Sequence, residues 1–515
     1  KLLVPVFAKL SNFVSGAGVW MNTQRPEWND ANNALAGFGA SVVTTAALLR
    51  HLEVLTDLLG SRDAHVTART AGFMTELCAA LAASTGEDDA ARWAFVRAAG
   101  EAGERHRSSV YAGDGLEAVV APVGEVMAFL AAARAVVQET LVACGREDGL
   151  FQTYNLLRFR KGAVEVARLP LMLEGQAAVL SSGALPPAAA IRLLDALRAS
   201  DLYREDLETY LLYPDRDLPG LSERGRIMEA AASSDPLIEA LLASGDTTVI
   251  QPPRGDSSAL RFGPDMHSVE SLRSALAALP EELQPLVERQ RETLEGYYES
   301  AFQHASFTGR SGSFFGYEGL GCTYWHMVSK LALAVQETLL RASDAGEAED
   351  VLDALRSHYR AIRAGIGAQS SPERYGAFPS EPYSHSPADG RVRQPGMTGQ
   401  VKEDLLARMA EVGLRIRNGR ITFDRTCVVD AEYCASAAVL PQRDGPGLPL
   451  PPGSFAFTHC GVPIVVRRGG PAEGRVYLES GEVRPFVPEE GLDVALSREV
   501  FRRSGHVQRI EVALA

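Results

Sequence analysis

The residues from Arg25 to Leu35 combine the side chains that a sugar-cleaving site needs. The stretch holds two carboxylates, one indole and three amides. Pro26 disfavours helical geometry at Arg25, so we expect a loop here, with a helix from about Asn33. On such a loop an indole covers the apolar side of a pyranose, amides and Arg bind hydroxyls, and a semi-enclosed Asp delivers a proton to the glycosidic oxygen. A capping Asp beside a packed Trp is the structural alternative, and residue types alone leave both open.

A second cluster surrounds Glu318, which follows Tyr317 in a glycine-rich stretch from Phe307 to Gly321. Glycines allow the backbone to approach a ligand closely, so this carboxylate could activate water or hold a sugar hydroxyl. Alternatively, it is a charge stabilised at a helix N-terminus. The helix that follows carries Trp325 and His326, and His326 could donate to phosphate, bind a sugar oxygen or lie in the core. No HExxH motif or similar spacing accompanies it, so no metal site is expected.

A third cluster runs from Ser380 to Arg391 and continues from Gln394 to Gln400, where another helix is expected to begin. The Thr398 hydroxyl and the free amides at the helix start offer neutral donors to phosphate or to a polarised water. An ordinary Thr cap is an equally good explanation of the same residues.

Composition restricts the class of protein. The chain has 515 residues, 46% of them hydrophobic, and a formal charge of -14, which suits a soluble enzyme and disfavours a nucleic-acid surface. Its six cysteines form no CxxC pair, so neither a zinc site nor a disulfide framework is indicated and a reducing compartment is expected. We find no apolar stretch of membrane-spanning length and no signal peptide, so we expect a cytoplasmic protein without a membrane partner. Because the chain starts at Lys1 and soon reaches its richest motif, we expect an N-terminal part to be missing.

The elements that must position these residues are mainly helices. From about residue 33 to 415, apolar residues recur at helical spacing between Pro and Gly breaks, which indicates about a dozen helices. Three stripes illustrate the pattern: Val126 to Leu141, Ile191 to Leu197 and Val351 to Ile362. Paired helices without a short repeat favour an α/α toroid over a solenoid or a mixed sheet. Two long loops are expected, from Gln251 to Met266 and from Gln369 to Met397.

After about Leu414 the pattern changes to alternation. Leu414 and Ile416 precede the turn pair Asn418-Gly419, which predicts a β-hairpin. Further strands are expected at 454–458, 462–466, 475–478 and 507–514. The predicted architecture is therefore mainly α, with an (α/α)6-type toroid, complete or incomplete, over 1–412 and a small C-terminal β-sandwich over 413–515.

Together these segments resemble the inverting cellobiose and chitobiose phosphorylase family. Its Asp-Trp-Asn-Asp type segment reads Glu27-Trp28-Asn29-Asp30 here, so Asp30 takes the position of the general acid and Glu27 replaces the first Asp. Later matches follow in the family's order: Glu381-Pro382-Tyr383, Gly390-Arg391, and Thr398-Gly399, whose counterparts touch phosphate. The family's phosphate-binding His motif has no full copy, although the region from Gly321 to His326 has a comparable place. The resemblance implies an (α/α)6 barrel, a C-terminal β domain and an upstream β-sandwich that is not in this sequence.

The leading hypothesis is an enzyme that cleaves a glycosidic bond of an oligosaccharide or glucan with inversion. Asp30 is the expected acid and inorganic phosphate the co-substrate, with no other cofactor. The expected contacts are as follows: Arg25, Glu27, Trp28, Asn29, Tyr317, Trp325 and Tyr383 for the substrate, and His326, Thr398 and Gly399 for phosphate. An inverting hydrolase with Glu318 as general base is a close alternative. A non-catalytic glycan-binding toroid, a helical lyase or cyclase using Tyr383 and His385, and a homodimer are left open.

Overall fold

The structure is a computed structural model with two compact units. It describes residues 1–22, 35, 37–60, 62–83, 88–214, 226–227, 235–253, 259–302, 307–308, 314–315, 323–366, 385–386, 400–442 and 446–514. Unit 1 comprises Lys1–Trp20, Ala40–Pro214 and Gly321–Ala515, and unit 2 comprises Met21–Gly39 and Asp215–Leu320. Of the short segments 307–308, 314–315 and 385–386, only the backbone is described.

Four helices of unit 1 run in the same direction side by side: α3 (Val42–Leu59), α7 (Leu173–Ser182), α13 (Trp325–Asp344) and α16 (Gln400–Glu411). At the start of α3 and α7, Val42 and Gly175 both bind Thr153. Eight residues further along α3, Arg50 binds Ser181 near the end of α7. These contacts show that α3 and α7 run in the same direction. The contacts of α13 and α16, described below, show the same for those two helices. We call these four the inner helices.

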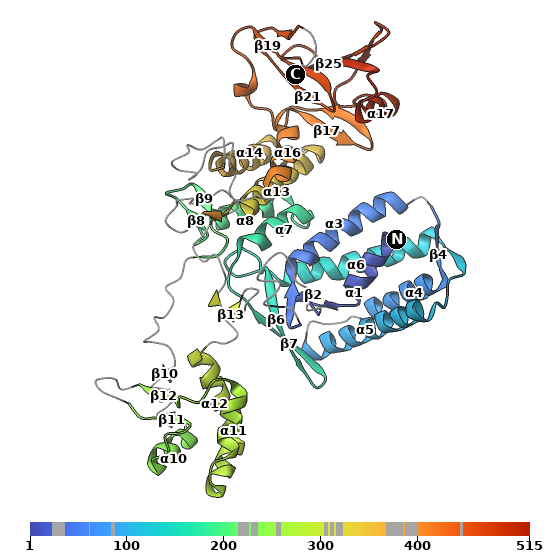
Figure 1. Ribbon diagram of the computed structural model, residues 1–515. Coiled ribbons are helices and arrows are strands. Elements are labelled where there is room, and N and C mark those ends of the chain that lie inside the picture. The colour runs from blue at the N-terminus through green and yellow to red at the C-terminus, as the bar shows by residue number, and fades with distance from the viewer. Residues whose placement is uncertain are drawn as a thin grey trace. The chain divides into compact units, whose positions relative to one another are not determined.

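Two inner helices pack against outer partners: α3 with α6 (Val123–Ala143), and α13 with α14 (Glu349–Ala364) (Figure 1). A third outer helix, α8 (Pro187–Arg198), contacts both α13 and α14. The predicted stripes are the buried faces of these partners. Val126, Phe129 and Leu141 of α6 are buried, as are Leu194 of α8 and Leu355 of α14. Periodicity identified these faces because burial on one side of a helix requires the 3.6-residue repeat.

One sheet of unit 1 was not predicted. Its strand order is β1 (Phe13–Val14), β2 (Gly18–Trp20), β3 (Gly39–Ser41), β6 (Tyr154–Arg160) and β7 (Ala163–Arg168). Helix α5 (Asp89–Ala112) packs on β7 and β1 of this sheet and pairs with α4 (Ala68–Ala82). Helix α4 in turn contacts α1 (Leu3–Leu10) and the ribbon of β4 (Ala64–Thr67) and β5 (Ala118–Ala121). No strands were expected here from the sequence, because strands of two to seven residues are too short to leave a clear alternation.

The C-terminal sheet domain confirms the predicted change of pattern after Leu414. Strands β17 (Leu414–Arg417) and β18 (Arg420–Phe423) form the predicted hairpin, and Asn418 and Gly419 have the positive φ values of 50° and 76° that such a tight turn requires. The main sheet has the order β21 (Ser454–His459), β22 (Val462–Arg468), β25 (Val507–Leu514), β23 (Glu473–Leu478) and β24 (Val483–Phe486). Helix α17 (Val494–Arg502) and the hairpin share its hydrophobic core. A short pair, β19 (Ala438–Leu440) with β20 (Leu448–Leu450), precedes it.

Unit 2 has a small hydrophobic core of its own. It contains the helices α10 (Pro236–Ser244), α11 (Val269–Ala277) and α12 (Gln284–Phe302) and the strands β10 (Arg226–Ile227), β11 (Ile250–Gln251) and β12 (Leu260–Phe262). Tyr298 of α12 is fully buried and donates a hydrogen bond of 2.8 Å to the Met266 carbonyl. The long loop expected from Gln251 to Met266 is therefore partly wrong, since β12 lies within it. The loop expected from Gln369 to Met397 falls mostly outside the described residues.

One described helix, α6, is long and apolar enough to cross a membrane by length and composition alone. The expectation that no stretch reaches this length was therefore wrong for Val123–Ala143. In the fold, α6 packs on α3 and α4 and places Phe129 and Val137 in the main core cluster. A core helix of a folded domain meets the same test of length and composition.

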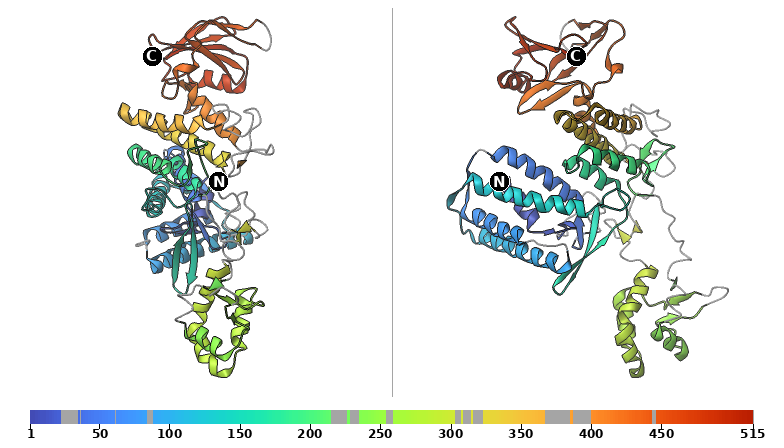
Figure 2. Two further views of the ribbon diagram at one scale, coloured as in Figure 1. Left: turned by 90° about the vertical axis from the view of Figure 1, so that its left-hand side faces the viewer. Right: turned by 180° about the vertical axis from the view of Figure 1, so that it is seen from behind.

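The predicted fold class is confirmed, because the chain is mainly helical and ends in a sheet domain. Both views of Figure 2 show α14 and α16 next to that sheet domain. An α/α toroid, as predicted, agrees with parallel inner helices that pack on outer partners. The predicted domain boundary at residue 412 stays a prediction.

Candidate functional site

Two of the predicted site residues, Trp325 and His326, lie among the described residues. The others lie outside them: Arg25, Glu27, Trp28, Asn29, Asp30, Tyr317, Glu318, Tyr383, Thr398 and Gly399. The roles of these ten residues stay predictions. The described part of the site is the set of side chains around the first turns of α7, α13 and α16.

The second and third predicted clusters meet at the start of α13. Strand β15 (Thr323–Tyr324) pairs antiparallel with β16 (His385–Ser386), with Tyr324 opposite His385. The pairing joins the residues just before α13 to the middle of the segment from Ser380 to Arg391. The sequence placed these clusters more than fifty residues apart, so this proximity is a result of the fold.

His326, the second residue of α13, contacts the first turn of α16. Its Nε2 lies 3.2 Å from Oε1 of Glu403, and its Nδ1 lies 3.4 Å from the hydroxyl of Tyr324. His326 is 8% exposed and Glu403 is 4% exposed. Burial lowers the pKa of His326, Lys330 lowers it further, and Glu403 acts in the opposite direction. The imidazole is therefore held neutral beside a buried carboxylate.

Glu174, in the first turn of α7, faces the same region. Its Oε2 accepts a hydrogen bond of 2.8 Å from the Tyr154 hydroxyl, and the residue is 5% exposed. Lys330 lies one turn after His326, and burial lowers its pKa while Glu174 and Glu403 raise it. Burial also raises the pKa of Tyr324 to about 12, with Glu174 and Glu403 adding to the effect. Tyr324 is therefore a neutral hydroxyl, able to donate, at physiological pH.

Glu174, Lys330 and Glu403 border a cavity of about 290 Å³ among the inner helices. Alanines of α3, α7 and α13 line much of it, including Ala46, Ala177 and Ala334. Glu174, Lys330 and Glu403 line one part, whereas Arg50, Ser181 and Glu337 form a hydrogen-bonded group in another. The cavity offers charged hydrogen-bonding groups within walls of small side chains, a combination that suits a polar ligand or ordered water.

Trp325 is 1% exposed and ranks among the largest fully buried side chains of the described residues. An indole that is enclosed to this extent offers no open face for stacking on a sugar. Its predicted role as a substrate contact stays a prediction, and in this conformation Trp325 packs in the interior at the start of α13.

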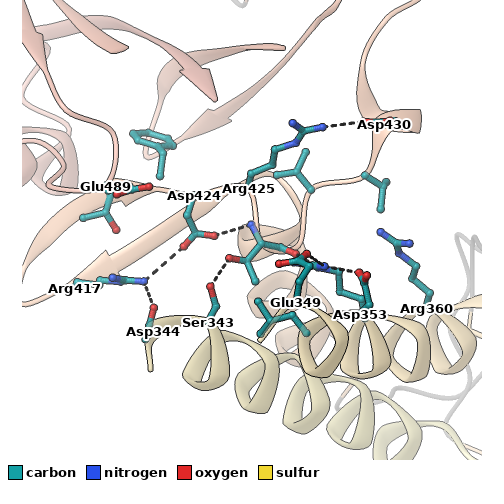
Figure 3. Close-up of a pocket in the computed structure, with 17 residues that line it drawn as sticks. Ser343, Asp344, Glu349, Asp353, Arg360, Arg417, Asp424, Arg425, Asp430 and Glu489 are labelled. Carbon is teal, nitrogen blue, oxygen red and sulfur yellow. Dashed lines mark hydrogen bonds and ion pairs between the residues drawn. The ribbon is translucent and has the colours of Figure 1, made fainter. Parts of the chain in front are cut away.

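A wider cleft of about 1040 Å³ lies between the α13–α14 hairpin and the C-terminal sheet domain (Figure 3). Its walls are held by ion pairs. Arg356 contacts Glu349 and Asp353 at 2.6 Å each, and Arg417 contacts Asp344 and Asp424. Among the described residues, Phe423 is the one aromatic residue that lines the cleft. Phe423 is fully buried, so the described lining offers no open aromatic face of the kind that stacks on a sugar.

Within the described residues, no group of three or more His, Cys, Asp or Glu side chains could hold a metal ion. The described site offers hydrogen-bond donors, carboxylates and lysines. An imidazole, a phenol and free amides at helix starts are donors suited to an anion or a hydroxyl.

Comparison with known families adds to this geometry. Residues 218–305 match the family model described as GH149 phosphorylase insertion domain 2. This segment resembles a phosphorylase domain. It lies within the second stretch of unit 2, Asp215–Leu320, which folds around its own core. The match supports a phosphorylase of the GH149 type and not specifically the cellobiose and chitobiose phosphorylases. No curated protein matches the chain.

Sequence reasoning missed Glu403, Glu174 and Tyr324 as members of the site. Glu403 follows Thr398-Gly399 by four residues, so its position in the first turn of the expected helix was a usable signal. Glu174 follows Pro170 and begins a helix, yet nothing in its neighbourhood distinguishes it from a carboxylate that stabilises a helix N-terminus. Tyr324 directly precedes Trp325 and His326, which were both predicted as site residues.

Proposed function

We propose that the protein is a glycoside phosphorylase that cleaves a glycosidic bond of an oligosaccharide or glucan with inversion at the anomeric carbon. Asp30 donates a proton to the glycosidic oxygen, and an oxygen of inorganic phosphate attacks the anomeric carbon from the opposite side. The carbon–oxygen bond to the leaving sugar breaks. The products are a sugar 1-phosphate and a saccharide with a new free hydroxyl.

The contact between His326 and Glu403 is the observation that carries this proposal. It brings the start of α13 to the start of α16, and α16 begins directly after Thr398-Gly399. Free amides at a helix start together with an imidazole and a hydroxyl form a site that favours an anion. The phosphorylase match at residues 218–305 supports the same class of reaction from a different part of the chain.

Phosphorolysis places a lower demand on carboxylates than hydrolysis does. A phosphorylase needs one acid, because phosphate is itself the nucleophile, whereas an inverting hydrolase also needs a base to activate water. We therefore assign Asp30 as the acid, and assign His326, Thr398 and Gly399 to phosphate. Arg25, Glu27, Trp28, Asn29, Tyr317 and Tyr383 are assigned to the sugar.

The test is a panel of disaccharides and glucans incubated with the protein, with and without inorganic phosphate. We expect sugar 1-phosphate to form only when phosphate is present, and the reverse reaction to release phosphate from sugar 1-phosphate and an acceptor. Equal release of free reducing sugar with and without phosphate would instead establish a hydrolase. Saccharide binding with no product in either condition would establish a glycan-binding protein.

A further inference from the structure

Glu403 is a buried carboxylate whose two oxygens have different surroundings. Oε1 lies 3.2 Å from Nε2 of His326 and 3.6 Å from Nζ of Lys402. Oε2 has no hydrogen-bond partner among the described residues, and the side chain lines the cavity between the inner helices. Burying a charged group with one oxygen unsatisfied is costly, so such an arrangement needs a reason beyond packing.

The contact with Glu403 determines which nitrogen of His326 carries the proton. A carboxylate oxygen accepts hydrogen bonds, so Nε2 must be the protonated nitrogen when it faces Glu403. In the neutral imidazole Nδ1 is then an acceptor, and its neighbour is the hydroxyl of Tyr324 at 3.4 Å. In this state neither Nδ1 nor the Tyr324 hydrogen that points to it is available to an anion.

Charged groups of two elements act on His326, and a group of a third element acts on its neighbours. Lys330 lies on the same helix, Glu403 and Lys402 lie on α16, and Glu174 of α7 acts on Tyr324 and Lys330. Burial and the two lysines lower the pKa of His326, while Glu403 raises it. Without an added anion the effects that lower the pKa of His326 outweigh those that raise it, so the imidazole is neutral. A bound anion beside Nδ1 would shift the balance toward the imidazolium.

We propose that Glu403 is a positioning residue that couples the binding of phosphate at His326 to the uptake of a proton by the imidazole. This inference rests on the proposed function and states how its phosphate site works. A proton from solvent adds to the lone pair of Nδ1, while Nε2–H continues to donate to Glu403. Nδ1–H is now a donor, and the Tyr324 hydroxyl, no longer needed as a donor to Nδ1, turns its hydrogen to the phosphate.

Glu403 serves this step in two ways. It holds the ring so that Nδ1 and not Nε2 faces Tyr324, and it provides the negative charge that stabilises the imidazolium in a buried place. A glutamine at this position could keep a hydrogen bond to Nε2, yet it would carry no charge. Proton uptake should therefore require the carboxylate itself.

The test is isothermal titration calorimetry of inorganic phosphate into the whole protein at one pH, in buffers of different ionisation enthalpy. Inorganic sulfate, which does not titrate in this range, is the second probe, so any proton taken up with sulfate goes to the protein. For the wild type we expect uptake of about one proton per anion bound. For Glu403→Gln we expect little uptake and an affinity for phosphate lower by roughly 10- to 100-fold.

Glu337→Gln is the matched control. It makes the same change at a second carboxylate lining the cavity, one that is paired with Arg50 and Ser181 instead of a histidine. This variant should keep the proton uptake of the wild type. The KM for phosphate is measured against pH in parallel. If Glu403 had only a structural role, Glu403→Gln would lower activity without moving this pH profile. The proposal predicts that the profile of Glu403→Gln shifts to lower pH.

Phosphate or sulfate binding to the wild type without proton uptake would overturn the inference, and so would equal uptake by Glu403→Gln. Phosphorolysis would stand in both cases, because the formation of sugar 1-phosphate is measured separately. If the wild type neither binds phosphate nor forms sugar 1-phosphate, the proposed function fails and the inference fails with it. The wild-type titration decides the matter even if Glu403→Gln does not fold.

Discussion

Arg50 and Glu337 lie 287 residues apart in the chain and are joined by two hydrogen bonds of 2.8 and 2.9 Å. Ser181 of α7 contacts both, at 2.7 Å from Arg50 and 2.9 Å from Glu337. Glu174 lies seven residues before Ser181, and Lys330 lies seven residues before Glu337. Because α7 and α13 run in parallel, this equal spacing brings Glu174 and Lys330 to the same level, beside the proposed phosphate site.

The first prediction concerns the contribution of this ion pair to stability. Arg50 exposes 50% of its side chain and Glu337 exposes 21%, so solvent screens the pair. In a double-mutant cycle with Arg50→Met and Glu337→Gln, we expect a coupling of about 0.5 to 1 kcal/mol in the free energy of unfolding. Arg475 and Glu473, at 51% and 54% exposure, form the control pair and should couple more weakly. A coupling near zero for Arg50 and Glu337 would contradict their role in aligning the helices.

A second prediction concerns Gln336, which is 1% exposed and joins three helices. Its Nε2 donates to the Tyr359 hydroxyl at 3.0 Å and to the Ala407 carbonyl at 2.9 Å. Gln336→Ala removes the donor for a buried carbonyl and leaves a cavity, so we expect the free energy of unfolding to fall by about 2 to 4 kcal/mol. Urea denaturation measures the change. Gln508→Ala, at an exposed hydrogen bond to Gly505, should cost much less, and equal losses would refute this view of Gln336.

Those parts of the fold that depend on local pattern could be predicted from the sequence. The stripe of Val126, Phe129 and Leu141 shows its buried face through spacing alone, and Asn418-Gly419 defines its turn through backbone preference. The hairpin of β6 and β7 was missed because its burial does not alternate cleanly: Tyr154 and Asn155 are both buried. Neighbouring residues that are both buried remove the two-residue period on which strand prediction depends.

The types of residue at the site could be predicted from the sequence, but the contacts between them could not. His326 was predicted because an imidazole can donate to phosphate, and because the region from Gly321 to His326 has a place comparable to the phosphate-binding His motif of the family that the chain resembles. Its partner Glu403 stands 77 residues later, and no local pattern connects the two. The sequence does offer the start of α16 as an anion site. That this start meets His326 follows only from the packing of α13 against α16, which is a tertiary property.

The third prediction is a dependence of stability on pH that arises from His358. Its Nε2 lies 3.1 Å from Asp195 Oδ1, and burial lowers the pKa of His358 while Asp195 acts in the opposite direction. Below about pH 6.5 the unfolded chain therefore binds a proton that the folded chain does not, so the free energy of unfolding falls as the pH falls. The loss continues until the pH reaches the lowered pKa of the folded state.

His358→Gln should remove this loss. Between pH 7.5 and pH 5 the wild type should lose stability more steeply than the variant, by at most about 1.4 kcal/mol per pH unit. Thermal unfolding at several pH values gives the comparison. His65→Gln, on the exposed side of β4, is the control and should follow the wild type. Parallel curves for the wild type and His358→Gln would show that the imidazole does not contribute.

The fourth prediction separates the proposed acid from the groups that bind the sugar. Asp30→Asn removes the proton donor and keeps the size of the side chain, so we expect kcat for a natural disaccharide to fall by about 10²- to 10⁴-fold. An aryl glycoside with a good leaving group needs no protonation, and its phosphorolysis should fall far less. Glu27→Gln makes the same change three residues away, and there we expect a higher KM for both substrates with a similar loss for each, since this residue is assigned to binding. If Asp30→Asn lowers the rates of both substrates equally, Asp30 binds the sugar and the proton donor is another residue.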